Sequence, residues 1–400
     1  MDAIADMMEK GIQDNVFPGA VLFVSVDSKI LFHRAFGRSD IYSNEMMSNE
    51  TIFDLASLTK PLATAMAVLK LIQDGSLRLD QTIGDVLNSV FNSSSFNLPK
   101  ALINVHDSIS AFICEKGVIT IEELLRHTSG LPAHRLYYKQ LIKYPLILRR
   151  NCLRALLIKE PLVHKPGEKE VYSDLGYILL AWIVEICSKQ RIDNFLREQV
   201  YLPLGIDDLF FIDLLDSVYP YGNPMVSTYE RTSSDISLRS ETFGKKFAAT
   251  ENCPWRKKLI KGEVHDDNAW AAGGIEGHAG LFGTASAVSV LLGELMNGLQ
   301  RRKTKIVSSN LLKRFVIKKN RGDRVAGFDT PSKPVSSSGR YFSASSIGHL
   351  GFTGTSFWID PEKSVIVVLL TNRVHPSRKN EKIRRFRPLI HDLVMEQFLL

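Results

Sequence analysis

The sequence predicts an α/β protein of the α+β kind, in which an antiparallel sheet is flanked by helices and joined to a mainly helical lobe. Two stretches of alternating apolar residues, each interrupted by a turn sequence, predict β-hairpins near opposite ends of the chain. The residues between these hairpins show mainly helical periodicity. Strands from both ends of the chain can therefore join one sheet.

Each element has its own local signal. Residues 1–10 are expected to form a first helix, and residues 20–36 a hairpin around an Asp-Ser-Lys turn. The apolar run at 61–72 predicts a buried helix, because its proline suits an early helical turn and an Asp-Gly pair follows as a stop. Residues 357–372 predict the second hairpin, and residues 382–399 the last helix.

This order of elements predicts a discontinuous domain. Residues 1–78 and 244–400 are expected to form the sheet domain, and residues 79–243 the mainly helical lobe, with the active site between them. Within the lobe, the segment 90–117 is rich in Ser and Asn, so we expect a loop or an insertion there.

The composition is that of a globular protein. With 400 residues, of which 44% are hydrophobic, the chain can bury one large core or two coupled ones. The formal net charge of +7 raises the question of an acidic partner. The chain has no recognisable nucleic-acid module and no basic tract with interleaved aromatic residues, so we interpret its basic stretches as solvated surface and expect no nucleic acid partner. A polyanionic partner such as the cell wall remains an alternative.

Cysteine usage and the N-terminus indicate the compartment. The four cysteines show no Cys-x-x-Cys spacing and are expected to be reduced core residues. Residues 1–10 are acidic where a secretion signal would be basic, and no apolar stretch follows them. The longest apolar run, at residues 177–183, is far shorter than the roughly 20 residues that a bilayer requires. We therefore expect a cytoplasmic protein without a membrane segment.

The candidate nucleophile is Ser57, which precedes Lys60 by three positions at the start of the buried helix. On a helix, positions i and i+3 share one face with Cβ atoms about 5–6 Å apart, so the lysine amine can approach the serine hydroxyl. Lys60 could accept the serine proton only if burial or a neighbouring positive group kept the amine partly neutral. Taken alone, the pattern also fits a helix N-cap serine followed by a solvated lysine.

Two further elements accompany this pair in the chain. Tyr172-Ser173-Asp174 stands at the head of another apolar helix, and His349-Leu350-Gly351 precedes a strand-like run. In this order the three elements resemble the motifs of the serine β-lactamase and penicillin-binding-protein superfamily, in particular its class C-like branch of esterases, carboxypeptidases and related amidases. The resemblance extends over nearly the whole chain and implies the β-lactamase/transpeptidase-like fold.

Several other stretches carry the same resemblance. They are Phe17-Pro18-Gly19-Ala20, Leu125-Arg126-His127-Thr128-Ser129-Gly130-Leu131-Pro132 and Gly277-His278-Ala279-Gly280-Leu281-Phe282-Gly283-Thr284. Of these residues, His127 is expected to brace a turn rather than to relay protons.

The resemblance implies a catalytic mechanism. Ser57 would attack an acyl carbon while Lys60 and Tyr172 share its proton, and water would hydrolyse the resulting acyl-enzyme. Tyr172 would need a lowered pKa, which an adjacent ammonium would supply. The oxyanion hole would consist of the backbone N–H groups of Ser57 and Phe352, where loss of one donor typically costs about 10²–10³ in rate. The close approach of the backbone there gives a role to Gly351.

The chain departs from the family pattern at the positions that would contact substrate. The third motif of β-lactamases and D-Ala-D-Ala peptidases reads Lys-Thr-Gly, whereas this chain has His349-Leu350-Gly351. Leu350 cannot donate a hydrogen bond, and His349, with an ordinary pKa of about 6.5, is mostly neutral at pH 7. Asp174 replaces an asparagine and adds negative charge. These substrate-binding candidates disfavour an anionic β-lactam, although a packed strand histidine would explain His349 as well.

We therefore expect a serine hydrolase that acts on a carboxylester or a related small acyl substrate. The alternative is an amidase or peptidase, carboxypeptidase-like, on cell-wall muropeptides, or a weak β-lactamase. A non-catalytic binding protein of the same fold is the third hypothesis, against which Ser57, Lys60 and Tyr172 argue.

Neither a cofactor nor a metal is expected. The polar run at residues 263–267, with His278 nearby, lacks the His-x-x-x-His spacing of a helical metal site, so we expect a loop with ordinary hydrogen bonds. The glycine-rich stretch at 273–277 lacks the Lys-Ser/Thr ending of a phosphate loop. Arg373 and His375 follow the last strand and are expected either to contact substrate or to lie in a surface loop.

Overall fold

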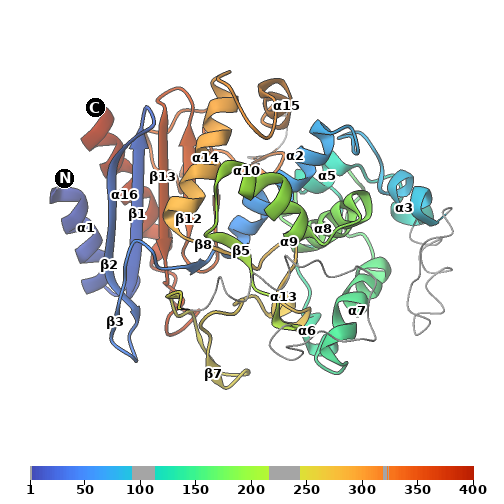
Figure 1. Ribbon diagram of the computed structural model, residues 1–400, viewed down its shortest axis with the longest axis horizontal. Coiled ribbons are helices and arrows are strands. Elements are labelled where there is room, and N and C mark those ends of the chain that lie inside the picture. Colours follow the sequence, from blue (N-terminus) through green and yellow to red (C-terminus); the bar gives the residue numbers. More distant parts are fainter. Residues whose placement is uncertain (1, 92–112, 216–243, 319–321, 323) are drawn as a thin grey trace.

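A computed structural model describes residues 2–91, 113–215, 244–318, 322 and 324–400. Most of the Ser- and Asn-rich segment that the sequence predicts to be a loop, residues 92–112, lies outside these residues. Figure 1 shows the large sheet and its two terminal helices on one side of the molecule and a mainly helical part on the other. The predicted fold class is confirmed.

The large sheet is antiparallel and contains eight strands in the order β3-β2-β1-β13-β12-β11-β10-β9. The strands are β1 Gly19–Val26, β2 Lys29–Asp40, β3 Glu45–Met46, β9 Arg324–Val325, β10 Phe328–Asp329, β11 Ile347–Leu350, β12 Ser356–Asp360 and β13 Val365–Thr371. The two predicted hairpins are β1–β2 and β12–β13. They meet at the centre of the sheet, where β1 pairs with β13 from Ala20 opposite Thr371 to Val26 opposite Val365.

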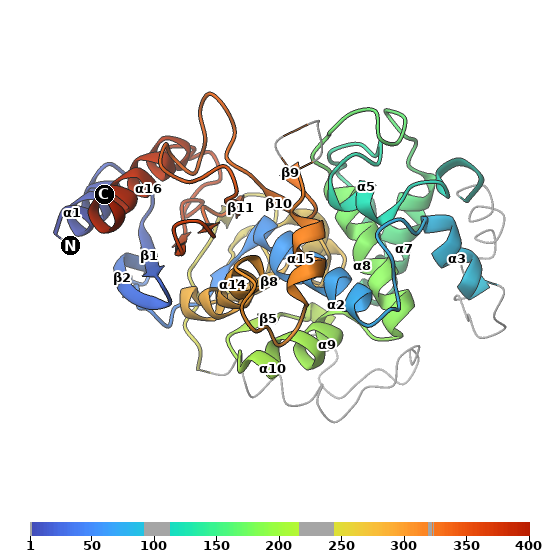
Figure 2. The same cartoon turned by 90° about the horizontal axis from the view of Figure 1, so that it is seen from above.

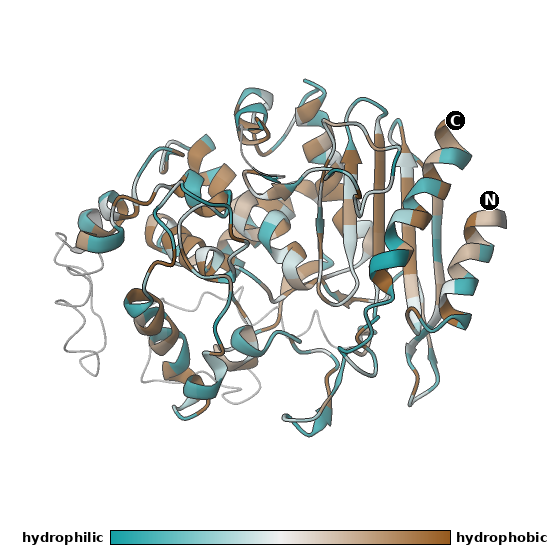
Figure 3. Cartoon of the chain, turned by 180° about the vertical axis from the view of Figure 1, so that it is seen from behind, coloured by the Kyte–Doolittle hydropathy of each residue, from teal (hydrophilic) through white to brown (hydrophobic). Residues whose placement is uncertain are grey.

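Successive side chains of β1 point to opposite faces of the sheet. Leu22 packs in a cluster with helices α1 (Asp2–Gln13) and α16 (Ile383–Leu399), which cover one face. Val21 and Phe23 belong to the main core cluster on the opposite side, where α14 (Ala285–Leu299) contacts the sheet. Figure 2 shows the two terminal helices together on their face, and Figure 3 shows apolar residues along the strands between the helix layers.

The helical part is built around α8 (Asp174–Ser188), which is buried from Leu175 to Glu185. A helix that is apolar on all sides must be surrounded by others, and α8 contacts α2, α3, α5, α7 and α9. The Ser173 side chain begins this helix by accepting a hydrogen bond from the Gly176 backbone N–H. The start of α8 is therefore fixed, and Asp174 in its first turn is fixed with it.

The remaining elements complete the helical part and connect it to the sheet. The helices are η1 Ala56–Leu58, η2 Lys60–Ala65, α2 Met66–Gln73, α3 Ile83–Phe91, α5 Ile121–Leu125, α6 Tyr138–Leu141, α7 Leu146–Lys159, α9 Ile192–Leu196, η4 Arg197–Tyr201, α10 Leu202–Leu204, α13 Asp267–Ala271 and α15 Ser309–Phe315. The short strands are β4 Phe53–Asp54, β5 Leu209–Phe211, β6 Asn252–Cys253, β7 Lys258–Leu259 and β8 Leu281–Gly283.

The helical part and the sheet part share one core. The main hydrophobic cluster is continuous from Val368 of the sheet to Leu180 of α8. In addition, β5, which the sequence assigns to the helical lobe, pairs with β8 in a small three-stranded sheet that also contains β4. The two parts are therefore joined by a common core, and the boundaries at 79 and 243 stay a prediction.

The cysteines correct one expectation. All four are free, but only Cys253 is buried and Cys114 is exposed. Cys152 and Cys187 are partly buried and pack against the edge of the main core, Cys152 from α7 and Cys187 from the end of α8, beyond its buried stretch. Among the described residues, no helix is long and apolar enough to cross a membrane.

The central position of α8 makes a stability prediction. Leu180→Ala should lower the free energy of unfolding by about 2–5 kcal/mol, because Leu180 is fully buried and its truncation leaves a cavity. Leu202→Ala, at a leucine that is 44% exposed, should have little effect. Urea unfolding of both variants measures the difference, and equal losses would contradict the packing around α8.

Candidate active site

Ser57 lies in the short helix η1, directly after strand β4. The residue before it, Ala56, has φ of +48°, a left-handed conformation that costs a non-glycine residue free energy and is often found at functional sites. The Asp54 carboxylate holds this conformation, since it accepts hydrogen bonds from the backbone N–H of Ala56 (2.8 Å) and of His265 (2.6 Å). Ser57, the predicted nucleophile, thus follows a strained residue whose conformation a buried carboxylate stabilises.

The helix that follows is less regular than predicted. It begins as a 3₁₀ turn, continues as a π-helical segment over Lys60–Ala65, and becomes α-helical from Met66. Pro61 has no N–H and cannot donate an α-helical hydrogen bond, which favours a change of register at this point. The predicted proximity of serine and lysine is nevertheless present.

Lys60 is fully buried, and its amine lies within 3.1 Å of three polar groups. The Nζ atom lies 3.1 Å from Ser57 Oγ and 2.8 Å from Asp174 Oδ1. It also donates to the backbone carbonyl of His278 at 3.1 Å. The Tyr172 ring packs below the amine, with its centroid 4.8 Å from Nζ. These contacts bring together the predicted nucleophile and both predicted proton-transfer groups.

The ionisation of Lys60 differs from the expectation of a partly neutral amine. Burial alone would lower the pKa of Lys60, but the attraction of Asp174 outweighs it and holds this pKa above the ordinary value. Burial likewise disfavours a charged Asp174, yet Lys60 holds the pKa of this carboxyl well below its usual range. At neutral pH the pair is therefore an ammonium and a carboxylate.

Tyr172 also differs from expectation. Its hydroxyl lies close to both Ser57 and Lys60. Burial raises the pKa of Tyr172, and the adjacent ammonium of Lys60 offsets only part of that increase. The sequence predicted a lowered pKa because it counted the ammonium and could not count the burial. Tyr172 is a neutral phenol at neutral pH.

Asp174 has both carboxylate oxygens engaged. One oxygen pairs with Lys60, and Oδ2 lies 3.3 Å from Nδ1 of His134, a residue that the sequence analysis missed. The hydrogen bond to Asp174 raises the pKa of His134. The position of Asp174 in the first turn of α8 further favours a negative charge. Its predicted role is contact with substrate, but the structure places it against Lys60.

A second ion pair lies beside the first. His278 Nε2 is 3.0 Å from Asp266 Oδ1, which lies in the polar run at residues 263–267. Burial would lower the pKa of His278, but Asp266 raises it, while His278 holds the pKa of Asp266 at about 2. The His278 carbonyl also binds the Lys60 amine. This pair therefore orients the turn that supports Lys60.

The third motif lies on β11. His349 is 3% exposed, and its ring centroid is 6.0 Å from that of Tyr172. Burial lowers the pKa of His349 to about 4, so the side chain is neutral at pH 7, as the sequence indicated. Its Nδ1 lies 2.9 Å from the Leu350 carbonyl oxygen. The fixed cation of the Lys-Thr-Gly motif thus has no equivalent at His349.

Two threonine side chains of the turn after β11 form hydrogen bonds with the segment that leads to Ser57. Thr353 Oγ1 donates to the Asp54 carbonyl at 2.7 Å, and Thr355 Oγ1 donates to the Leu55 carbonyl at 3.2 Å. A Cβ atom on Gly351 would lie 1.9 Å from the Thr355 hydroxyl and 2.8 Å from the Leu55 carbonyl oxygen, so only glycine fits there. Phe352, the predicted second oxyanion donor, lies within this turn.

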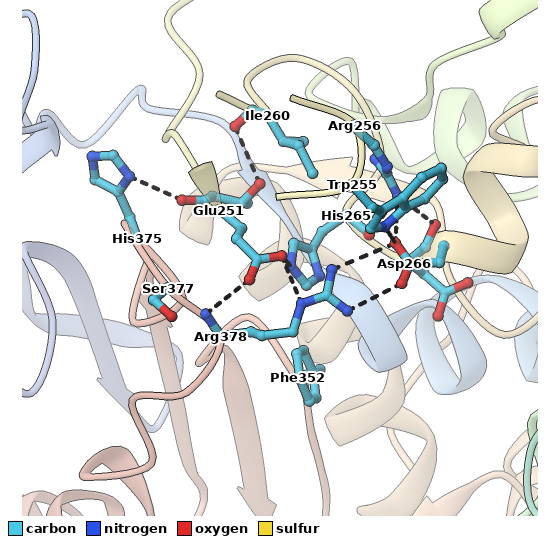
Figure 4. A network of polar contacts seen from close by, with 12 residues as sticks. Glu251, Trp255, Arg256, Ile260, His265, Asp266, Phe352, His375, Ser377 and Arg378 are labelled. Carbon is cyan, nitrogen blue, oxygen red and sulfur yellow. Dashed lines mark hydrogen bonds and ion pairs between the residues drawn. The ribbon is translucent and has the colours of Figure 1, made fainter. Parts of the chain in front are cut away.

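Figure 4 shows a polar network behind this turn that the sequence did not reveal. Arg378 lies between two carboxylates, with Nε 2.6 Å from Glu251 and Nη1 3.1 Å from Asp267. Glu251 also faces His265 at 3.3 Å. The His265 ring stacks on Phe352, with centroids 5.6 Å apart and planes inclined by 22°. The network therefore fixes one side of the Phe352 ring, which is 50% exposed at the surface.

His127 has the bracing role that the sequence predicts. Its Nδ1 accepts a hydrogen bond from the Ser173 backbone N–H at 2.9 Å, and its ring lies 4.5 Å from that of Tyr172. Arg324, which the sequence analysis missed, covers the Tyr172 ring at 5.2 Å and pairs with Asp329 at 2.8 Å. No spacing rule predicts these contacts, because they join segments far apart in the sequence.

The chain is similar to known proteins over nearly its whole length. A family model described as Beta-lactamase matches residues 4–391. A putative D-alanyl-D-alanine carboxypeptidase of Escherichia coli (strain K12) is 28% identical over 392 residues, which cover 92% of this chain and 82% of the relative.

Solved structures show the same fold. The octameric penicillin-binding protein homologue from Pyrococcus abyssi superposes with a TM-score of 0.66 at 18% identity, covering 99% of this chain and 77% of the homologue. EstCE1, a hydrolase with promiscuous acyltransferase activity, has a TM-score of 0.66 at 19% identity, covering 97% of this chain and 98% of EstCE1.

The buried ion pair makes a prediction for Asp174→Asn. Removing one partner of a buried pair typically costs about 3–5 kcal/mol, so the variant should be destabilised by about that amount at pH 7. The lowered pKa of Asp174 contributes stability that is present above its unfolded value of about 3.9 and lost as the pH falls through the folded value. The raised pKa of Lys60 contributes stability below about pH 10.4 that is lost at higher pH.

The difference between wild type and Asp174→Asn should therefore be constant from about pH 5 to pH 9 and shrink below about pH 4. Denaturant unfolding across this range measures it. Asp80→Asn is the control, because Asp80 pairs with Arg78 at the exposed surface. A variant at Asp174 that is as stable as this control at pH 7 would contradict the buried pair.

Proposed function

The chain belongs to the Beta-lactamase family of serine hydrolases, and we propose that Ser57 forms an acyl-enzyme with a carboxylester or a related small acyl substrate. The observation that carries this proposal is the contact of Ser57 with a buried lysine and a neutral tyrosine, next to a third motif without a positive charge.

The proposed proton route follows from the ionisation of the site. Tyr172 gives its proton to the leaving alkoxide as the C–O bond breaks, and in the same step its oxygen takes the proton of Ser57, whose Oγ forms the bond to the acyl carbon. A neutral phenol suits this relay, since it returns unchanged. Lys60 stays an ammonium and stabilises the negative charge that develops on the tyrosine oxygen. Water then follows the same route to hydrolyse the acyl-enzyme.

The oxyanion would be bound by the backbone N–H groups of Ser57 and Phe352. The conformation of Ala56 and the threonine hydrogen bonds of the turn after β11 support this role. They hold the peptide groups that carry the Ser57 and Phe352 N–H independently of the substrate. Preorganised donors stabilise the charge of the transition state without a reorganisation cost.

The substrate preference rests on His349 and Leu350. Neither supplies a fixed cation or a hydroxyl donor for a substrate carboxylate, which disfavours penicillins and favours esters without such a group. The negative charge of Asp174, which the sequence analysis counted against anionic substrates, carries less weight because Lys60 neutralises it.

An amidase or carboxypeptidase acting on cell-wall muropeptides is the alternative. It is supported by the relatives whose printed name is putative D-alanyl-D-alanine carboxypeptidase. A cytoplasmic location, supported by the four free cysteines, would suit a fragment of the cell wall as substrate.

The first functional prediction concerns Ser57→Ala. The variant should fold normally and hydrolyse a short-chain p-nitrophenyl ester at least about 10³-fold more slowly, because loss of the nucleophile removes the covalent route. Ser286→Ala, at an exposed serine of α14, should keep full activity. Release of amino acid from a muramoyl-peptide by the same samples ranks esterase against peptidase. Full ester turnover by Ser57→Ala would eliminate the mechanism, and silence of the wild type on both substrates would favour a binding protein.

A second prediction tests the penicillin exclusion. The double variant His349→Lys/Leu350→Thr should be acylated faster by a fluorescent penicillin, because it restores the cation and hydroxyl of the Lys-Thr-Gly motif. The single variant Leu350→Thr restores only the hydroxyl and should gain less. An unchanged acylation rate in the double variant would mean that the shape of the cleft, and not the missing charge, excludes penicillins.

A further inference from the structure

The turn that carries Phe352 is already complete in backbone hydrogen bonds. The Gly354 N–H donates to the Gly351 carbonyl at 3.1 Å, and the Gly351 N–H donates to the Thr355 carbonyl at 2.7 Å. Gly354 has φ of +111°, which favours glycine at this position. Both carbonyl groups therefore have a donor without help from any side chain.

Arg387 of helix α16 nevertheless reaches this turn. Its Nη2 atom donates to the Gly351 carbonyl at 3.0 Å and to the Thr355 carbonyl at 2.8 Å. The side chain is 5% exposed, so its cation is almost completely removed from water. A helix at the C-terminal end of the chain thus places a positive charge directly behind the predicted oxyanion hole.

No carboxylate among the described residues compensates the burial of this cation. No acidic side chain of the described residues lies within ion-pair distance of Arg387, and its Nε atom has no hydrogen-bond partner among them. Burial, together with the positive charges of Arg373 and Arg384, lowers the pKa of Arg387 to about 9. An unpaired buried charge is costly, and here it does not satisfy an otherwise orphaned carbonyl. A fold that needed only packing would have no use for a charge at this position.

The geometry of the peptide group indicates what the charge does. The Gly351 carbonyl and the Phe352 N–H belong to one planar peptide unit. A charge-assisted hydrogen bond to the oxygen fixes the plane and draws electrons toward the oxygen, which strengthens the N–H as a donor. Within the described chain, the Phe352 N–H donates to no protein acceptor. It is therefore available to a substrate oxygen.

A second arginine fixes the other side of Phe352. Arg373 Nε donates to the Phe352 carbonyl at 2.8 Å, and its guanidinium lies 4.6 Å from the centroid of the Phe352 ring. Arg373, which the sequence left open between substrate contact and surface loop, is thus a buried brace of this turn. The peptide units before and after Phe352 each bind a guanidinium.

We propose that Arg387 is a positioning residue that orients and polarises the Gly351–Phe352 peptide, so that its N–H stabilises the oxyanion of the transition state. This inference rests on the proposed acyl transfer at Ser57. It predicts that Arg387 acts on the transition state and contributes nothing to net folding stability.

The test compares Arg387→Met, Arg387→Lys and the control Arg384→Met on p-nitrophenyl acetate. Arg384 lies on the same helix but is 73% exposed and pairs with Glu381. In Arg387→Met we expect kcat to fall about tenfold, less than the roughly 10²–10³ for a lost donor, with KM unchanged. Affinity for an arylboronic acid, which mimics the tetrahedral intermediate, should fall in parallel. The thermal midpoint should stay equal or rise, because an unpaired buried charge is removed.

Arg387→Lys should show an intermediate loss of kcat, since it keeps the positive charge but its shorter side chain holds the ammonium farther from the two carbonyls than Nη2 of the guanidinium. It provides the decisive measurement if Arg387→Met is not obtained folded. Arg384→Met should match the wild type in kcat, KM and boronic acid affinity.

Two outcomes would overturn the inference. One is a wild-type kcat in folded Arg387→Met or Arg387→Lys. The other is a loss of activity that comes with a lower thermal midpoint and a higher KM, which would make Arg387 a structural brace. Ser57→Ala in the same assay separates these results from failure of the proposed function: activity retained in Ser57→Ala would disprove acyl transfer itself, whatever Arg387 does.

Discussion

The buried ammonium of Lys60 is the constraint on which the rest of the site depends. A fully buried cation is tolerated only where charge and hydrogen bonds replace water, and here they come from Ser57, Asp174 and the His278 carbonyl. These partners lie on η1, on the first turn of α8 and on the turn before β8. The contacts that replace water around the Lys60 amine therefore fix the relative positions of three segments, and Ser57 is held in place as a result.

The same constraint determines the chemistry. Because Asp174 keeps Lys60 charged, the lysine is not a free base, and the mechanism that we propose passes the proton through the neutral hydroxyl of Tyr172. The cation instead acts electrostatically. Arg373 and Arg387 also place positive charge against the peptide units on either side of Phe352, the proposed oxyanion donor. In the proposed mechanism, a proton moves between oxygen atoms while the positive charges around it stay in place.

Much of this arrangement could be predicted from the sequence. The hairpins are encoded by local alternation, and the i, i+3 spacing of Ser57 and Lys60 survives the irregular helix. The pKa values of Lys60 and Tyr172 could not be predicted, because they depend on burial and on Asp174, which approaches from more than 100 positions away. His134 and Arg387 were missed for the same reason. Their contacts exist only after the helices have packed, and no periodicity encodes them.

The central claim is that Ser57 carries a covalent acyl group during turnover. The most direct test is to quench the protein during turnover of a p-nitrophenyl ester and to determine the intact mass and the mass of its peptides. We predict a single acyl adduct per chain, located on the peptide that contains Ser57. Turnover without any adduct, or an adduct on a different residue, would contradict this account.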